Sequence, residues 1–307
     1  LVPRIKALKE DGIVPQLAAI IVGEDPASQV YVRNKASAFE KLNCKSQTFQ
    51  LEEDSDEQKV LGLIDMLNQD DTVVEIGCGR GALTDLIIEK VLKFYGIELD
   101  ENLFMNLREK YKNENVEMIN QDARLVNISE LIKNNNSYKL VGNLPYNHAN
   151  KIIMNFLQND FQPEIMIVMV QLEVAQRIAG IPKFRGYLSA IIDTYSESKI
   201  LFKVNSTSFY PEPKVASAVI QLIPRKSPLI NKSDIHDFFN FIANSFVSRR
   251  KTILNSLSMG NKISKEIISK VLQDVGIESN LRPQNLNTID WIKIFFPISN
   301  FIKKNER

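Results

Sequence analysis

Short apolar runs alternate with amphipathic stretches along most of this chain. Val, Ile, Leu and Phe are frequent in the runs, and between them apolar residues return every three or four positions. The first pattern predicts buried strands, and the second predicts helices that cover them. Regular alternation of the two predicts an α/β fold with a mostly parallel, doubly wound, Rossmann-like sheet. Its strands are expected at residues 72–76, 94–99, 116–120, 139–143 and 164–170.

The two ends of the chain differ from this middle part. The N-terminal pattern predicts a partial βαβα segment, with strands at residues 16–22 and 46–51 and helices at residues 29–42 and before Asn68. Beyond Pro224 only helical periodicity remains, and a small helical C-terminal domain is expected, clearest at residues 238–246 and 264–275. The three predicted domains are residues 1–70, 71–224 and 225–307.

Composition and charge narrow the class of protein. No stretch approaches the roughly 18 apolar residues of a membrane span, and the first residues lack the order of a signal peptide, so we expect a cytoplasmic protein without membrane contact. Cys44 and Cys78 lack the spacing of a zinc site or a disulfide framework, and no metal is expected. Residues 225–307 hold 14 basic and 7 acidic side chains, a net charge of +7, which suits nucleic-acid contact or simply a solvated surface.

A glycine-rich loop follows the strand at residues 72–76. Glycines at alternate positions let the backbone turn sharply and approach a ligand without a Cβ in the way. The spacing G-x-G-x-G, with an acid two positions before the first glycine, resembles the loop of methyltransferases more than the G-x-G-x-x-G cradle of dinucleotide-binding enzymes. A tight turn without a ligand is the alternative. The predicted cofactor-binding residues here are Glu75, Gly77, Gly79 and Gly81.

Two further acids stand at the ends of the next two strands. Glu98 can accept hydrogen bonds from both hydroxyls of a ribose, and Asp122 can accept one from an adenine amino group. Each acid alone could be a helix cap or a surface charge. Because ligands in such sheets bind at the carboxyl ends of the strands, the three acids together favour a shared binding site.

The fourth strand ends in Asn143-Leu144-Pro145-Tyr146, the most specific motif of the chain. An exocyclic adenine amine is a poor nucleophile because its lone pair is delocalised into the ring. Hydrogen bonds accepted by the Asn143 side chain and a nearby carbonyl would favour a pyramidal nitrogen, with its lone pair aimed at a methyl donor. Proline fixes the turn, and Tyr146 offers a ring on which a base can stack. An ordinary turn after a strand is the alternative.

Other candidate contacts lie further along the chain. Phe209 could form a second wall of a base pocket or pack under its proline-stiffened turn, and Tyr210 is expected to be structural. His148 follows the Asn-Leu-Pro-Tyr motif, but transfer of a methyl group to a neutral amine needs no general base. A basic run suits contact with RNA phosphates or remains solvated, and it consists of Arg249, Arg250 and Lys251.

Residues 71 to about 296 resemble the bacterial small-subunit ribosomal RNA adenine dimethyltransferases. The segments that carry the resemblance are EIGCGRGALT, GIELD, QDA, GNLPYN, MVQLEVAQRI, SFYPEPKVASAVIQL and FVSRRKTILNSL. The resemblance implies a class I methyltransferase fold, S-adenosyl-L-methionine as the methyl donor, and two methyl groups added to each of two adjacent adenines of 16S RNA during ribosome biogenesis. It also implies that Asn143 and Tyr146 hold the amine, and that the partner is an immature small ribosomal subunit. A monomer is expected.

Residues 1–70 are similar to another family, through PQLAAIIVGEDPASQVYVRNKASAFEKL. The similarity is to the folate-binding half of methylenetetrahydrofolate dehydrogenase/cyclohydrolase, and it implies that Tyr31 and Lys35 correspond to residues of the folate site. It stops before Asp70, and no nicotinamide-binding domain follows. The segment with a G-Q-x-F-L-like motif that precedes Asp71 in the dimethyltransferases is also missing, so we expect weakened donor binding or a fused chain.

The sequence thus predicts an S-adenosylmethionine-dependent dimethyltransferase that acts on N6 of adjacent adenines in small-subunit RNA. One alternative is a ribosome-assembly factor that binds RNA without transferring a methyl group. A folate-dependent dehydrogenase/cyclohydrolase is a second alternative. Methylation of DNA is disfavoured, because enzymes of that class more often carry D-P-P-Y in place of N-L-P-Y.

Overall fold

The computed structural model describes residues 16–22, 37, 44–51, 72–132, 137–208, 215–246 and 250–305. The chain forms two compact units, one of residues 1–70 with 89–92 and the other of residues 71–88 with 93–307. In the first unit β1 (Gln16–Val22) pairs in parallel with β2 (Lys45–Leu51), as predicted. Apart from Ser37, the two helices predicted in this unit lie outside the described residues.

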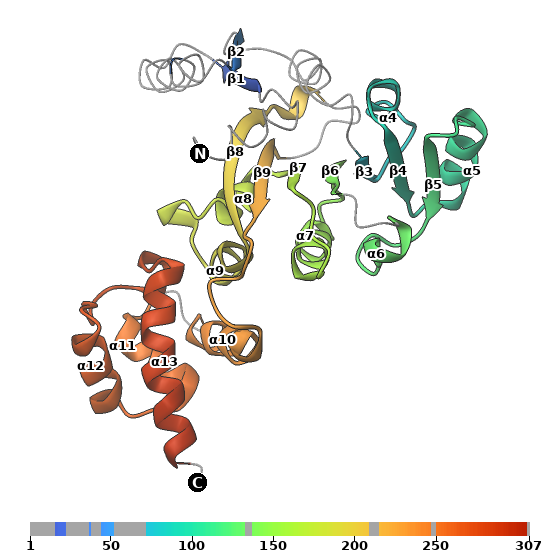
Figure 1. Ribbon diagram of the computed structural model, residues 1–307. Helices are drawn as coiled ribbons and strands as arrows, with labels where there is room; N and C mark the ends of the chain where they lie inside the picture. Colours follow the sequence, from blue (N-terminus) through green and yellow to red (C-terminus); the bar gives the residue numbers. More distant parts are fainter. Residues whose placement is uncertain are drawn as a thin grey trace. The chain divides into compact units, whose positions relative to one another are not determined.

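The second unit is built on a seven-stranded sheet with the order β5-β4-β3-β6-β7-β9-β8 (Figure 1). Its first five strands in sequence pair in parallel, and β8 and β9 extend the sheet in antiparallel fashion. The strands are β3 (Thr72–Ile76), β4 (Lys93–Glu98), β5 (Val116–Asn120), β6 (Lys139–Asn143), β7 (Ile165–Gln171), β8 (Ser196–Val204) and β9 (Ser217–Pro224). The five predicted strands of the doubly wound sheet are therefore confirmed.

The middle strands of the sheet are covered by helices on both faces, so their side chains must be apolar on both sides, as the apolar runs are. All five residues of β3 are buried, as expected for a parallel strand with helices on either side. The connecting helices are α4 (Thr84–Ile87), η1 (Ile88–Lys90), α5 (Glu101–Lys110), α6 (Ile128–Leu131), α7 (Ala149–Gln158), α8 (Leu172–Ile178), η3 (Pro182–Phe184), α9 (Tyr187–Tyr195) and η4 (Ser206–Ser208). Between β3 and β4, helix α4 is only four residues long and continues as the 3₁₀ turn η1.

The chain order places a topological switch in the middle of the sheet. From β3 the chain moves outward through β4 to β5, and it then returns to the other side of β3 to form β6 and β7. Loops leaving the carboxyl ends of β3 and β6 therefore separate in opposite directions. In open α/β sheets, this point forms a crevice in which ligands bind.

The described residues beyond β9 form helices and their connections, as predicted, and Figure 1 shows the helices gathered in a bundle. They pack around a separate apolar core in which Phe238, Trp291 and Phe295 are almost fully buried. Ring contacts between Phe238 and Phe295 and between Phe241 and Trp291 strengthen this core. The elements are α10 (Lys232–Ser245), α11 (Ile253–Asn261), α12 (Lys265–Asp274), η5 (Pro283–Asn285) and α13 (Thr288–Asn305).

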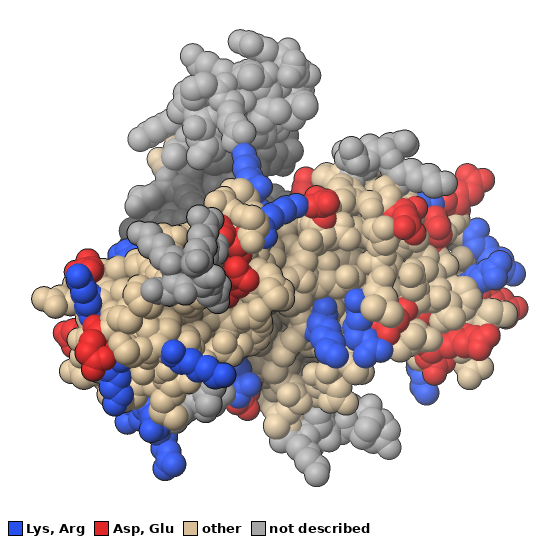
Figure 2. All heavy atoms as spheres, turned by 90° about the horizontal axis from the view of Figure 1, so that it is seen from below, with Lys and Arg blue, Asp and Glu red and all other residues tan. Residues whose placement is uncertain are grey.

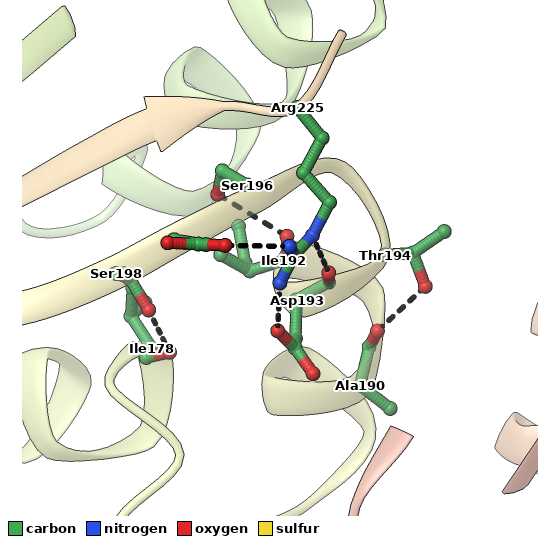
Figure 3. Close-up of polar contacts among 9 residues, drawn as sticks. Ile178, Ala190, Ile192, Asp193, Thr194, Ser196, Ser198 and Arg225 are labelled. Atoms are coloured by element: carbon green, nitrogen blue, oxygen red, sulfur yellow. Dashed lines mark hydrogen bonds and ion pairs between the residues drawn. The ribbon is translucent and has the colours of Figure 1, made fainter. Parts of the chain in front are cut away.

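Arg225 ties the linker between the sheet and the helical bundle to α9. Its Nε donates to the carbonyl of Asp193 at 3.0 Å, and its Nη2 to the carboxylate of the same residue at 2.9 Å. The remaining guanidinium nitrogen, Nη1, donates to the carboxylate of Glu197 at 2.9 Å. Figure 3 shows Arg225 reaching toward Asp193 from the chain that follows β9. The start of the linker is thus held by several charge-assisted hydrogen bonds.

Candidate active site

A cavity of about 690 Å³ opens at the carboxyl ends of four neighbouring parallel strands. We call it the strand-end cavity. It has the size of a site for a small organic ligand. Its walls come from the ends of β3, β4, β5 and β6 and from the start of α7. They include the predicted residues Gly77, Glu98, Asp122, Asn143, Leu144, Pro145 and Tyr146.

The glycine loop after β3 turns through three left-handed residues. Gly77, Gly79 and Gly81 have φ angles of +73°, +58° and +86°. Only glycine adopts such angles readily. A Cβ on Gly77 would stand 3.5 Å from the carbonyl oxygen of Asn143, and one on Gly81 only 2.3 Å from the hydroxyl of Tyr111. Gly77 is thus required by its left-handed backbone, whereas at Gly81 the missing Cβ also lets the loop pack on Tyr111.

Glu98 is held in a fixed orientation at the end of β4. The residue is only 8% exposed, and its two carboxylate oxygens accept different backbone N–H groups. Oε2 accepts from Gly79 at 2.9 Å, and Oε1 accepts from Asp100 at 3.0 Å. Each oxygen keeps a further lone pair, and the residue lines the strand-end cavity. The carboxylate can therefore accept from two neighbouring hydroxyls of a ligand.

Asp122 is bound by Arg124, a residue that the sequence interpretation did not single out. The Arg124 guanidinium and backbone N–H donate to the carboxylate, and these hydrogen bonds hold the pKa of Asp122 down at about 2. Nη1 of Arg124 also lies 3.3 Å from Nδ1 of His148. All three residues line the strand-end cavity. An arginine soon after a strand-end acid is too common in sequences to have pointed to this contact.

The Asn143-Leu144-Pro145-Tyr146 corner is fixed by backbone hydrogen bonds. The N–H of Leu144 donates to the carbonyl of Met169 at 3.1 Å, which continues the pairing of β6 with β7. The carbonyl of Pro145 accepts from His148 and Ala149, and these bonds begin α7. Among the described residues, the Asn143 side chain takes part in none of these hydrogen bonds, and it lines the cavity.

The hydroxyl of Tyr146 lies 2.8 Å from that of Ser217, a fully buried residue at the start of β9. This contact fixes the far end of the Tyr146 ring. Sequence interpretation missed Ser217, although it lies within the recognised SFYPEPKVASAVIQL segment. A single serine before an apolar run carries no distinguishing signal.

Glu75 does not line the strand-end cavity, although the sequence pattern placed it among the cofactor-binding residues. It is 2% exposed, and its carboxylate accepts from the hydroxyl of Thr84 at 2.7 Å. Thr84 is the first residue of α4, so Glu75 supports the glycine loop from beneath. Burial raises the pKa of Glu75 to about 7, against the lowering effect of the Thr84 hydrogen bond.

This raised pKa predicts a pH-dependent stability. The folded chain retains a proton on Glu75 that the unfolded chain loses near pH 4.5, so the free energy of unfolding falls as pH rises from about 4.5 to 7. Glu75→Gln keeps an acceptor for Thr84 and removes the charge. The substitution should have little effect at pH 5 and should stabilise the protein at pH 8 by up to about 3 kcal/mol. Urea denaturation at both pH values measures the difference, and equal effects at the two would contradict this account.

The remaining predicted residues fall in different places. Phe209, Tyr210 and Arg249 lie outside the described residues, as do Tyr31 and Lys35. Arg250 and Lys251 are described and exposed. Within the described ranges, His, Cys, Asp and Glu form no group that could hold a metal ion. A search of the same ranges finds no helix long and apolar enough to cross a membrane.

Comparison with known proteins supplies family matches over nearly the whole chain. Residues 47–297 match the family model described as ribosomal RNA adenine dimethylase. Residues 1–76 match that of the tetrahydrofolate dehydrogenase/cyclohydrolase catalytic domain, in agreement with the similarity seen in the first 70 residues.

Individual relatives point the same way. Ribosomal RNA small subunit methyltransferase A of Clostridium botulinum (strain Kyoto / Type A2) is 38% identical over 231 residues, which cover 74% of this chain and 84% of that protein. The protein with the same name from Ureaplasma urealyticum serovar 10 is 34% identical over 249 residues, with coverage of 78% and 85%.

Two solved structures share the fold. They are the 23S rRNA methyltransferase ErmE and a dimethyladenosine transferase from Plasmodium falciparum. Each has a TM-score of 0.62 and 23% sequence identity and covers 80% of this chain; the matched part is 98% of the first and 96% of the second. At this identity the likeness shows the fold alone. It confirms the predicted Rossmann-like, doubly wound α/β architecture.

Proposed function

Because this chain belongs to the ribosomal RNA adenine dimethylase family, we propose that it transfers methyl groups to N6 of two adjacent adenines in small-subunit RNA. The observation that carries the proposal is a shared cavity. Glu98, Asp122 and the Asn143–Tyr146 corner come from three separate strand ends and line one space. A donor and an acceptor base held there would face each other, and this positioning supplies much of the catalysis.

The cavity fits S-adenosyl-L-methionine as the methyl donor. Glu98 would accept hydrogen bonds from the ribose hydroxyls, and Asp122 would accept one from the adenine amino group. Arg124 donates to Oδ1 of Asp122 through its backbone N–H and to Oδ2 through Nη2, and its Nε is shared between the two oxygens. The adenine amine would take the place of the shared Nε contact at Oδ2. Gly77 lines the same cavity. When bound, the donor supplies a sulfonium methyl group that is open to in-line displacement.

Asn143 and Leu144 are proposed to hold the acceptor amine. The side-chain oxygen of Asn143 accepts one N–H of the amine, and the carbonyl of Leu144 accepts the other. The carbonyl of Pro145 is less suitable, because it already accepts from His148 and Ala149. Two accepted hydrogen bonds favour a pyramidal nitrogen whose lone pair points at the methyl group. The excess proton leaves the product amine readily, so no side chain has to remove it first.

Tyr146 is proposed to stack on the acceptor base, with Ser217 as the residue that positions its ring. Ser217→Ala should lower kcat about fivefold and leave donor affinity unchanged, because one buried hydrogen bond contributes about 1 kcal/mol. Tyr146→Phe should do the same, and the double variant should be no worse than either single one. Ser196→Ala is the control, since Ser196 is also fully buried and its hydroxyl donates to the backbone carbonyl of Ile192, away from Tyr146. Additive losses would contradict the coupling.

The substrate and the place of action follow from the same proposal. RNA bound against the basic C-terminal part would be held through its phosphates, with Arg250 and Lys251 among the contacts. Arg249 and Phe209 remain candidates for the RNA and the base, respectively. We propose that the protein acts as a monomer in the cytoplasm on immature small ribosomal subunits. The boundaries of the methyltransferase and helical domains, at residues 70/71 and 224/225, are part of this proposal.

Incorporation of tritiated methyl groups into immature small subunits tests the function. The chain should label undermethylated subunits with up to four methyl groups, two on each of two adjacent adenines, and should leave fully methylated subunits unlabelled. Binding of subunits without labelling would instead identify an assembly factor. Nothing in the described residues favours a folate-dependent activity, and reduction of a nicotinamide cofactor by methylenetetrahydrofolate would be needed to support it.

A further inference from the structure

A second hollow lies beside the strand-end cavity and shares Arg124 with it. Its volume is about 390 Å³, and the proposed methyl transfer does not use it. One wall is the loop after β5, and the other is the exposed side of α7. We call it the Lys151 groove, and it is lined by Arg124, Leu125, Lys151, Met154, Asn155 and Gln158.

Charge in the groove favours an anion. Two cationic side chains line it, and its lining contains no carboxylate. Lys151 is exposed and forms no ion pair with any residue that the structure describes. Arg124 engages Asp122 through Nε and Nη2, so its Nη1 faces away from that carboxylate, 3.3 Å from His148. A phosphate at Lys151 would therefore be repelled by no negatively charged side chain of the groove lining.

The groove also presents an apolar surface. Leu125 is 76% exposed, and no large apolar side chain in the described part of the chain is more exposed. Met154 lines the groove on the α7 side. The face of a nucleobase can cover such side chains and remove apolar area from water. A ligand with both an anionic and a flat apolar part matches these two features.

The walls are fixed before any ligand arrives. The side-chain amide of Asn155, on α7, donates to the carbonyls of Ala123 and Val126 at 3.2 and 3.0 Å. These bonds bracket the loop that carries Arg124 and Leu125. Because the loop is already ordered, ligand binding loses no free energy to ordering it.

We propose that the Lys151 groove binds the nucleotide next to the target adenine, with its phosphate at Lys151 and its base against Leu125. The inference rests on the proposed function. An RNA strand whose adenine enters the strand-end cavity must continue across the rim of that cavity, and Arg124 forms part of both spaces. Figure 2, seen from below the view of Figure 1, shows blue basic side chains side by side near the middle of the molecule, with tan surface and some red acidic side chains around them.

Binding of an RNA hairpin with two adjacent adenines in its loop tests the groove. Lys151→Glu should weaken binding at least tenfold and reduce the dependence of log K on log salt concentration by about 0.7, the contribution of one phosphate on a single strand. Leu125→Ala should weaken binding about fivefold without altering the salt dependence. Lys112→Glu is the matched control, because Lys112 follows α5 at the end of the sheet opposite the cavity.

Affinity for S-adenosylhomocysteine, measured on the same proteins, should be equal in all of them and shows that each variant is folded. Wild-type affinity for the hairpin in both groove variants, in a protein that methylates subunits, would overturn the groove and leave the proposed function standing. If the wild-type chain binds the hairpin in a way that depends on Lys151 but methylates no subunits, the groove stands and the proposed function is overturned. A wild-type chain that neither binds the hairpin nor methylates subunits would overturn both.

Discussion

Asn143→Ala should reduce methyl transfer to undermethylated small subunits by about a thousandfold, while donor affinity stays nearly unchanged. The alanine methyl group cannot accept a hydrogen bond, so the amine of the target adenine would remain planar and poorly nucleophilic. Loss of one preorganised hydrogen bond that strengthens in the transition state costs about 10²- to 10³-fold in kcat. Single-turnover rates with tritiated donor measure the chemical step, and calorimetry with S-adenosylhomocysteine measures donor binding.

A matched control lies four residues away. Asn147 is exposed and does not line the strand-end cavity, so Asn147→Ala should retain the wild-type rate. If both variants lose methyl transfer to a similar degree, Asn143→Ala acts by disturbing the fold of the loop. Unchanged turnover in Asn143→Ala would remove this residue from the chemistry.

Glu98→Gln should weaken donor binding about a hundredfold. Each carboxylate oxygen accepts a backbone N–H, and an amide would turn an NH₂ group toward the N–H of Gly79 or Asp100. One acceptor is lost, and the charge that strengthens hydrogen bonds from the ribose hydroxyls disappears with it. Hydrogen bonds to charged groups contribute about 1.5–3 kcal/mol each, which agrees with a hundredfold change.

Glu101→Gln provides the comparison for this variant. Glu101 is exposed in the first turn of α5 and does not line the cavity, so donor affinity should remain at the wild-type level. The two proteins differ by the same chemical change three residues apart. A donor affinity in Glu98→Gln equal to that in Glu101→Gln would refute the ribose-binding role.

Much of the sheet could be predicted because burial on both faces leaves a plain signal. Residues such as Val74, Leu140 and Met166 are fully buried, and near-continuous apolar runs are typical of such strands. The carboxyl ends of parallel strands lie at the same edge, so Glu98 and Asn143 could be placed together before any coordinates. The antiparallel pair β8 and β9 was not predicted, because β8 lies at the sheet edge and mixes polar with apolar residues.

The contacts that tune the site could not be read from the sequence. Arg124 contacts Asp122 from two residues away, and Ser217 contacts Tyr146 only through the fold; neither residue type is unusual at its position. Glu75 shows the opposite difficulty. Its place before the glycines is distinctive, yet its side chain points beneath the loop toward Thr84. Spacing identifies which residues lie near a ligand, but the side-chain direction on a strand decides which of them touch it.

Arg225 and a shared apolar contact join the helical bundle to α9 across the proposed domain boundary. Ala190 of α9 belongs to the core of the bundle, whereas Ile192, two residues later, belongs to the core of the sheet. A fragment that began after Pro224 would lose the carboxylates of Asp193 and Glu197 and would uncover the surface that Ala190 protects. Recombination between relatives could therefore exchange the bundle only together with α9, and a protease that cut the linker would not release an intact folded piece.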